Sequence, residues 1–249
     1  MACVISATSS NSGKTLLSLL LVSWLKSRKK TVQTFKVGPD YLDPQQLSGV
    51  SKKACRNLDL ILSGEKWVKE SFSHFGGLTD FSLVEGVMGL FDGIGSSSKG
   101  STAELAKVLG LPIVLIVDAR GKAASIAALI KGFKEHDKEL KIAGIVLNNV
   151  QTSRHEQILL EVLNQINIKS LGCIPSCEDL YLPSRHLGLA PVHEILDLEI
   201  KVKKWASIAK DCLDIESFEN LLLPPKSKIK TINYLKKKES GLVHPIAIA

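Results

Sequence analysis

The sequence lacks any apolar run long enough to cross a membrane. Its longest one, Leu16 to Leu25, is broken by Ser18 and Ser23 and is far shorter than the ~20 residues that a spanning helix needs. A secretory leader has a basic stretch before an apolar one, and the sequence near Met1 has no such basic stretch. We therefore expect a cytoplasmic protein without membrane contact.

Cysteine is scarce, and its spacing suggests no framework. The chain has 5 cysteines in 249 residues, an odd number in a chain too large to need disulfide stapling. Only Cys173 and Cys177 lie close together, and a C-x3-C pair without a second pair or a histidine cluster is weak support for zinc. We expect reduced thiols with small, buried side chains.

Acidic residues are absent from one segment, and this explains the net charge. The formal charge is +7, but six lysines and no acidic residue fall between positions 226 and 238, and without them the charge is +1. A lysine-rich segment that follows two prolines is typical of a solvated linker. The charge therefore does not predict a nucleic-acid-binding protein.

Apolar runs alternate with helical patterns along most of the chain. Several runs are apolar nearly throughout, as happens when helices cover both faces of a sheet. This predicts an α/β fold with a doubly wound, mostly parallel sheet. The predicted strands are 3–7, 32–37, 81–85, 113–118, 142–147 and 170–174, and the predicted helices are 14–27, 65–75, 102–109, 123–134 and 155–165.

Two further patterns concern helices. Ser101 and Glu104 form a capping-box signature, in which Ser101 caps the amide of Glu104 and Glu104 reaches back. Apolar residues recur every three or four positions from Ile195 to Cys212. This stripe predicts an amphipathic helix that covers an edge of the sheet.

The strongest local signal is A-T-S-S-N-S-G-K-T at residues 7–15, between a predicted strand and a predicted helix. This context is typical of a phosphate-binding loop, in which backbone amides, here around Ser12 and Gly13, face the phosphates. Lys14 would neutralise phosphate charge, and the Thr15 hydroxyl would bind Mg²⁺. The usual first glycine of such a loop is replaced by Thr8.

Two more loops follow predicted strands and carry charged residues. One loop holds Lys36, Asp40 and Asp43, and the other begins at Glu85 and contains Asp92. Ligands of open α/β sheets bind outside the carboxyl ends of strands, so both loops should lie beside the phosphate loop. Ordinary turn chemistry is the alternative for the first loop, and a surface acid is the alternative for Asp92.

Longer phrases resemble the synthetase domain of the cobyrinic acid a,c-diamide synthases, a P-loop family similar in fold to dethiobiotin synthetase. The resemblance runs from the first strand to about Ala190. The phrases are T-F-K-V-G-P-D-Y-L-D-P (34–44), C-R-N-L-D-L (55–60), V-E-G-V-M-G-L-F-D-G (84–93), G-S-T-A-E-L-A-K (100–107), G-I-V-L-N-N-V (144–150) and L-P-S-R-H-L-G-L (182–189).

This resemblance implies an ATP- and Mg²⁺-dependent carbon–nitrogen ligase of cobalamin biosynthesis. It would amidate the a- and c-carboxylates of cobyrinic or hydrogenobyrinic acid through an acyl phosphate. The implied catalytic residues are Lys36, Asp40, Glu85 and Asp92, and the metal ligands are Thr15, Asp40 and Glu85. The implied nucleotide-binding residues are Ser12, Gly13, Lys14, Thr15 and Asn148. Of these, Asn148 would read the adenine edge. The implied substrate-binding residues are Tyr41, Leu42, Arg185 and His186.

The resemblance also suggests how the chain is divided. Residues 1–223 would form the ATP-binding synthetase domain, residues 224–245 a basic linker, and residues 246–249 the start of a missing glutaminase domain. No cysteine has a nucleophile context, so we expect no glutaminase activity from this chain. Ammonia would come from glutamine through a glutaminase domain or separate chain, and a homodimer is compatible with this scheme.

Three alternatives stay open. A partitioning or septum-placement ATPase switch would carry a second lysine early in its phosphate loop, and residues 7–12 contain none. Another ligase of the dethiobiotin synthetase type would act on a smaller acid. A catalytically incomplete fragment would bind nucleotide without turning over substrate.

Overall fold

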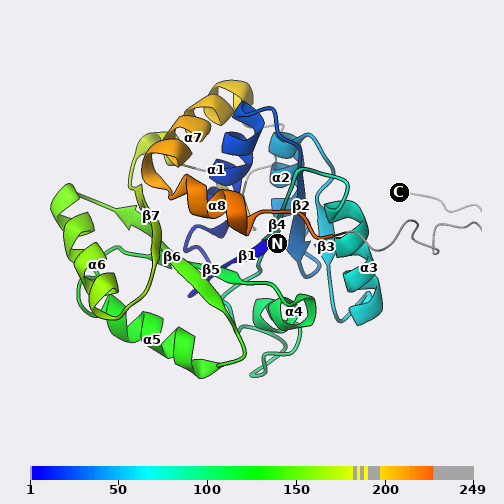
Figure 1. Ribbon diagram of the computed structural model, residues 1–249, viewed down its shortest axis with the longest axis horizontal. Coiled ribbons are helices and arrows are strands. Elements are labelled where there is room, and N and C mark those ends of the chain that lie inside the picture. Colours follow the sequence, from blue (N-terminus) through cyan, green and yellow to red (C-terminus); the bar gives the residue numbers. More distant parts are fainter. Residues whose placement is uncertain (1, 182–183, 186–187, 190–196, 227–249) are drawn as a thin grey trace, which may run out of the picture.

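A seven-stranded parallel sheet, covered by helices on both faces, forms the centre of the molecule (Figure 1). The structure, a computed structural model, describes residues 2–181, 184–185, 188–189 and 197–226. The strand order is β3-β2-β4-β1-β5-β6-β7, and every pairing is parallel. The predicted doubly wound α/β fold is confirmed.

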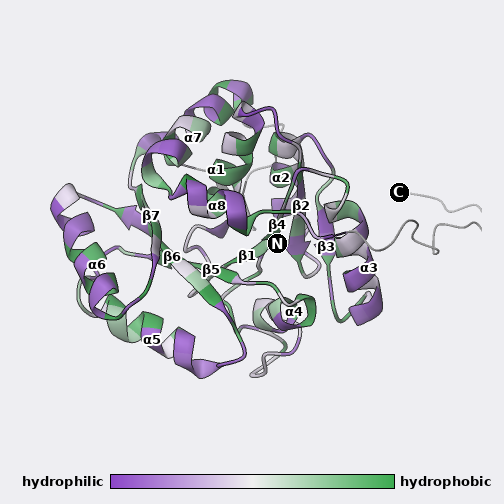
Figure 2. Ribbon diagram, viewed as in Figure 1, coloured by the Kyte–Doolittle hydropathy of each residue, from purple (hydrophilic) through white to green (hydrophobic). Residues whose placement is uncertain are grey.

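The strands are mostly β-branched or apolar runs that are buried on both faces, which is why Figure 2 shows much of the sheet as hydrophobic. All six predicted strands are present, although two of them extend further than expected. The strands are β1 (Cys3–Ala7), β2 (Val32–Val37), β3 (Arg56–Leu58), β4 (Phe81–Glu85), β5 (Ile113–Asp118), β6 (Ile142–Val150) and β7 (Ser170–Pro175).

The helices form two layers, and each layer closes its own hydrophobic core against the sheet. One layer holds α1 (Lys14–Ser27), α2 (Asp43–Ser51), α7 (Leu198–Cys212) and α8 (Ile215–Leu221). The other layer holds α3 (Gly64–Gly76), α4 (Thr102–Leu109), α5 (Ile126–His136) and α6 (Ser153–Gln165).

Helix α1 is apolar almost all round, and its position explains why. Residues 17–25 are all buried, because the sheet lies on one side of the helix and α7 on the other. The stripe that predicted α7 has Trp205 as its fully buried centre, and α7 also packs against the edge strand β7. Ile195, the first residue of that stripe, lies outside the described residues.

Several local elements differ from the prediction. The sequence analysis did not predict β3, α2, α8 or the short 3-10 helix Glu178–Leu180. The strand β3 has three residues and α2 contains Gly49, so neither shows a clear period. The two-stranded sheet of β8 (Ser184–Arg185) and β9 (Gly188–Leu189) was not predicted either. Helix α5 begins at Ile126 rather than at residue 123.

The capping box is confirmed in part. The Ser101 hydroxyl accepts a hydrogen bond from the Glu104 amide at 3.2 Å, as predicted. The Glu104 carboxylate, however, accepts from the amide of Gly100 instead of that of Ser101. All five cysteines are free thiols, but only Cys3 and Cys173 are buried as expected; Cys55 and Cys212 are half-buried, and Cys177, in the loop after β7, is exposed.

The topology decides where a ligand can bind. The chain crosses from β1 to β2, then returns to β4 beside β1, and afterwards builds outward in the other direction through β5, β6 and β7. Such a reversal leaves a crevice at the carboxyl ends of the strands on either side of it. The loops after β1, β2 and β4 all open at this edge.

Two further expectations concern membrane-spanning helices and the C-terminal segments. Within the part that the structure describes, no helix is long and apolar enough to span a membrane. The predicted basic linker lies outside the described residues from position 227 onward, and so do residues 246–249.

Removing the side-chain cap of α8 should destabilise the fold. The Asp214 carboxylate accepts from the Ser217 amide at 3.0 Å and pairs with Lys169 at 3.2 Å. We expect Asp214→Ala to lower the free energy of unfolding by about 1 kcal/mol, and Asp214→Asn to lose less because it keeps an acceptor. Urea denaturation measures both variants, and equal losses would contradict the capping role.

The same carboxyl should contribute to acid sensitivity. Burial alone would raise the pKa of Asp214, but hydrogen bonds from Ser217 and Lys169 outweigh it and lower the pKa. A folded-state pKa below the unfolded value means that this stabilisation is present at neutral pH and is lost as the pH falls through the folded pKa. The stability difference between wild type and Asp214→Ala should therefore shrink in acid.

Candidate functional site

The phosphate loop joins β1 to α1 and is held by local hydrogen bonds. The Ser12 hydroxyl donates to the Ser9 carbonyl at 3.0 Å, and Asn11 and Gly13 adopt positive φ angles of 60° and 110°. At Gly13 a Cβ atom would lie 2.3 Å from the Nδ2 atom of Asn148. Glycine is therefore required here both for its backbone angle and for space.

Asn148 holds the backbone of this loop by a hydrogen bond. It lies on β6 with 4% of its surface exposed, and its Nδ2 atom donates to the Ser12 carbonyl at 2.9 Å. Its Oδ1 atom is buried without a hydrogen-bond partner. The predicted contact with the adenine edge stays a prediction; the geometry places the side chain against the loop backbone.

Lys14, the first residue of α1, points across the loop and is nearly buried. Its Nζ atom donates to the carbonyl of Met88 at 2.5 Å and to that of Ser9 at 3.5 Å. Burial, and next the positive charge of Lys36, lower the pKa of Lys14 to about 8. The ammonium therefore lies where a phosphate anion would stabilise it.

Lys36, at the end of β2, gathers the acidic residues of the site. Its Nζ atom lies 2.8 Å from Glu85 Oε1, 2.5 Å from Asp43 Oδ2 and 3.4 Å from Asp40 Oδ2. The Lys36 side chain is 1% exposed and that of Glu85 is 0% exposed. Burial alone would lower the pKa of Lys36, but the attraction of Glu85 and Asp43 is larger and raises it.

Thr15 connects the phosphate loop to this cluster. Its hydroxyl donates to Glu85 Oε1 at 2.9 Å, whereas Glu85 Oε2 is buried and has no hydrogen-bond partner. A hydroxyl, an unpartnered carboxylate oxygen and Asp40 nearby fit Mg²⁺, which keeps several waters and needs only one or two carboxylates beside phosphate oxygens. Within the described ranges no group of three or more His, Cys, Asp or Glu side chains could hold a metal by itself.

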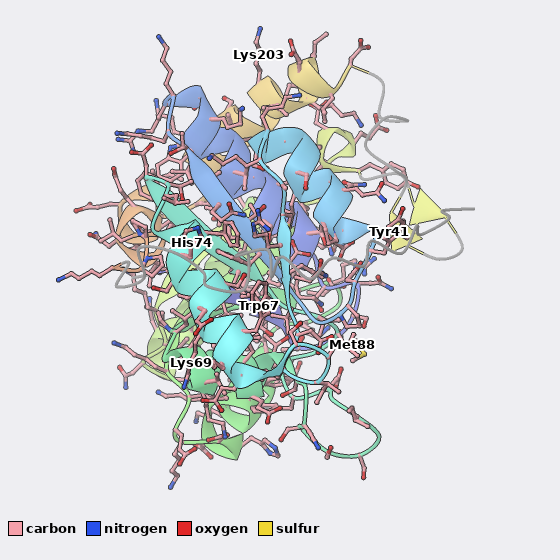
Figure 3. The ribbon with its side chains drawn as sticks, turned by 90° about the vertical axis from the view of Figure 1, so that its right-hand side faces the viewer. Tyr41, Trp67, Lys69, His74, Met88 and Lys203 are labelled. Carbon is pink, nitrogen blue, oxygen red and sulfur yellow. The ribbon has the colours of Figure 1, made fainter. Side chains whose placement is uncertain are left out.

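The loop after β2 is shaped by Asp40 and by a neighbour on β3. Asp40 Oδ1 accepts from the amides of Leu42 and Asp43 at the start of α2, and Asn57 donates to the carbonyls of Gly38 and Asp40 at 2.8 Å each. Tyr41, which follows Asp40 in this loop, is 76% exposed. Figure 3 shows Tyr41 and Met88 projecting on the same side of the molecule.

A shallow groove of about 550 Å³ lies beside this loop and is lined by Asp40, Tyr41, Asn57 and residues of α2. Leu42 is half-buried at the N-terminal end of α2.

The remaining predicted site residues are Asp92, Arg185 and His186. Asp92 has no hydrogen bond to Lys36 or to its acidic partners Glu85, Asp43 and Asp40. Its carboxylate accepts from the Gly89 amide at 2.8 Å. Arg185 lies in β8, and His186 lies outside the described residues.

Two members of the site were missing from the sequence-based set. Asp43 pairs directly with Lys36, and its position in the same charged loop was a signal that could have identified it. Asn57 holds that loop from the next strand. Nothing in its local pattern points to this role, because it depends on the pairing of β2 with β3.

Comparisons with known proteins show to which family the chain belongs. Residues 3–189 match the family model described as the CobQ/CobB/MinD/ParA nucleotide binding domain. The chain belongs to this family. Among solved structures, chloroplast FtsY from Physcomitrella patens is 12% identical, with 70% of this chain and 58% of that chain covered and a TM-score of 0.47, a likeness too slight to bear on function.

Curated relatives are named more specifically. The cobyrinate a,c-diamide synthase of Caldanaerobacter subterraneus is 42% identical, covering 97% of this chain and 54% of that protein. Its namesake in Gloeobacter violaceus is 40% identical, covering 100% and 54%. The hydrogenobyrinate a,c-diamide synthase of Mycobacterium bovis is 41% identical, covering 78% and 43%. The chain spans about half the length of these relatives.

Breaking the central ion pair from one side should be costly. Lys36→Met leaves the buried Glu85 carboxylate without its nearest cation, and we expect a loss of about 3–5 kcal/mol in the free energy of unfolding. Adding Glu85→Gln should recover part of this loss, because the uncompensated charge is gone. Urea denaturation of the single and double variants measures the coupling.

Lys69→Met is the matched control for Lys36→Met. Lys69 pairs with Glu65 on α3, but both side chains are more than half exposed, and such a pair contributes about 0–1 kcal/mol. A Lys36→Met variant no less stable than Lys69→Met would contradict the assignment of the buried pair.

Removing the hydrogen bond from Asn148 to the phosphate loop should weaken nucleotide binding without changing the preference between adenine and guanine. We expect Asn148→Ala to reduce the affinities for ATP and GTP by a similar factor, about tenfold, because the Ser12 carbonyl and the loop lose one buried hydrogen bond. Titration calorimetry measures both affinities, with Asn220→Ala on α8 as the control. A loss confined to ATP would instead assign Asn148 to the adenine edge.

Proposed function

We propose that this chain is the ATP-dependent ligase part of an enzyme that amidates the a- and c-carboxylates of cobyrinic or hydrogenobyrinic acid in cobalamin biosynthesis. The observation that carries the proposal is the buried contact of Lys36 with Glu85, which meets the phosphate loop through Thr15. The names of the curated relatives supply the substrate class.

In the proposed first step, a peripheral carboxylate of the corrinoid attacks the γ-phosphorus of ATP. The bond between this phosphorus and the bridging oxygen breaks, which yields an acyl phosphate and ADP. Lys14 and Lys36 carry the positive charges that would stabilise the negative oxygens of the transferring phosphoryl group. Bound Mg²⁺, held by Thr15, Glu85 and Asp40, would neutralise phosphate charge.

In the second step, ammonia attacks the acyl carbon, inorganic phosphate leaves, and one proton is released as the amide forms. Ammonia would come from glutamine through a glutaminase domain or partner chain. Tyr41 and Leu42 are the proposed substrate contacts, and the exposure of Tyr41 beside Asp40 supports this role. Arg185 and His186 are assigned to the substrate from the family resemblance alone, and a homodimer is compatible with these assignments.

An amidation assay tests the proposal. The purified chain with Mg-ATP, cobyrinic acid and ammonium chloride should release ADP and form mono- and diamide, which mass spectrometry identifies. Glutamine in place of ammonium should give no amide. Glu85→Gln should lower kcat by about 10²-fold or more, because the metal and Lys36 lose a charged partner.

The exposed carboxylate variant Glu65→Gln on α3 is the control and should retain wild-type turnover. ATP binding without substrate-dependent ADP release or amide formation would contradict the proposal. That result would favour a nucleotide-binding fragment or an ATPase switch.

A further inference from the structure

The loop after β4 presents one peptide group directly to Lys14. The carbonyl of Met88 accepts from Lys14 Nζ at 2.5 Å. The amide of Gly89, which belongs to the same peptide bond, donates to Asp92 Oδ2 at 2.8 Å. The Met88–Gly89 peptide group therefore lies between the ammonium of Lys14 and the carboxylate of Asp92.

We propose that Asp92 is a positioning residue, which fixes the Met88–Gly89 peptide so that its carbonyl holds Lys14 in the orientation that receives the phosphates of ATP. An ammonium group has three donors. Met88 and Ser9 accept two of them, so the third is left for a phosphate oxygen. The proposal rests on ATP binding as part of the proposed function.

The side chain of Met88 does not explain the orientation of this peptide. It is 42% exposed and projects away from the body of the molecule (Figure 3). Its backbone has a φ angle of 48°, a left-handed conformation that is strained for a side chain of this size. A strained conformation at a contact with a functional lysine has to be imposed by neighbouring groups.

Those neighbours are visible on both sides of the peptide. The amide of Val87 donates to the hydroxyl of Thr102 at 3.0 Å, and the amide of Leu90 donates to the carbonyl of Ala7 at 2.8 Å. These bonds anchor the two ends of the segment to α4 and β1. Asp92 supplies the contact to the peptide between them, and its acceptor oxygen faces the backbone of its own loop.

Gly89 is fitted to this arrangement. A Cβ atom at this position would lie 2.7 Å from Asp92 Oδ2 and 3.2 Å from the carbonyl of Thr8. A methyl group would therefore displace the carboxylate without removing its charge. Gly89→Ala thus disturbs the same contact as Asp92→Ala by an independent route.

The test measures the affinity of the full chain for Mg-ATP with no corrinoid and no ammonia, so that failure of the amidation does not affect it. Asp92→Ala should bind ATP about tenfold more weakly, the usual effect of losing one hydrogen bond that orients a charged group. Asp92→Asn keeps an acceptor for the Gly89 amide and should stay within about threefold of wild type.

Asp80→Ala is the matched control. Asp80 is also an exposed aspartate that accepts from a backbone amide, that of Thr31 at 2.8 Å, but it lies in the turn that precedes β4. It should bind ATP as wild type does. Thermal unfolding of each variant shows that the compared proteins are folded.

A double-variant cycle provides the second test. Gly89→Ala should weaken ATP binding in the wild-type background and cause little further loss in the Asp92→Ala background, because both act on one contact. The proposal is overturned if Asp92→Ala binds ATP as wild type does, or more tightly. It is also overturned if Asp92→Asn is as weak as Asp92→Ala, or if the two losses add.

Discussion

The contact between Lys36 and Glu85 is the constraint on which the arrangement of the site depends. Two side chains with opposite charges lie at the ends of neighbouring strands, almost without solvent exposure. Such a pair is tolerated only when each charge meets its partner in good geometry, because the desolvation cost of either ion alone is several kcal/mol. The parallel register of β2 and β4, which places Lys36 opposite Glu85, supplies that geometry.

The same pair explains why three separate loops come together. Lys36 draws Asp40 and Asp43 inward from the loop after β2, and Glu85 accepts the hydroxyl of Thr15 from the phosphate loop. Lys14 then occupies the remaining side, where burial and the charge of Lys36 disfavour its protonated form. The site therefore holds cationic groups close together, at an electrostatic cost that phosphate oxygens would relieve.

The sequence was sufficient for six of the seven strands of the sheet, and it placed several polar residues at the ligand edge, for an identifiable reason. Buried parallel strands are apolar on both faces, so β1, β4 and β5 are recognisable from composition alone, and the residues that follow such strands are known to face the ligand edge. Lys14, Thr15 and Glu85 meet these conditions. Elements such as α2 and β3 are short and lack a period, because tertiary contacts define them.

What the sequence could not predict is which partner each polar group finds. Asp92 stands three residues after Gly89 in a glycine-rich loop, and only the folded backbone shows that its carboxylate meets the amide side of the peptide whose carbonyl meets Lys14. Asn148 is similar, since its contact with Ser12 joins residues that are 136 positions apart. Asp92 hydrogen-bonds to the loop after β4 and Asn148 to the phosphate loop, and each of these loops offers one carbonyl to Lys14. A loop that must direct its amides toward phosphate and its carbonyls toward Lys14 needs such supports, because glycine in the backbone brings conformational freedom that does not hold these directions by itself.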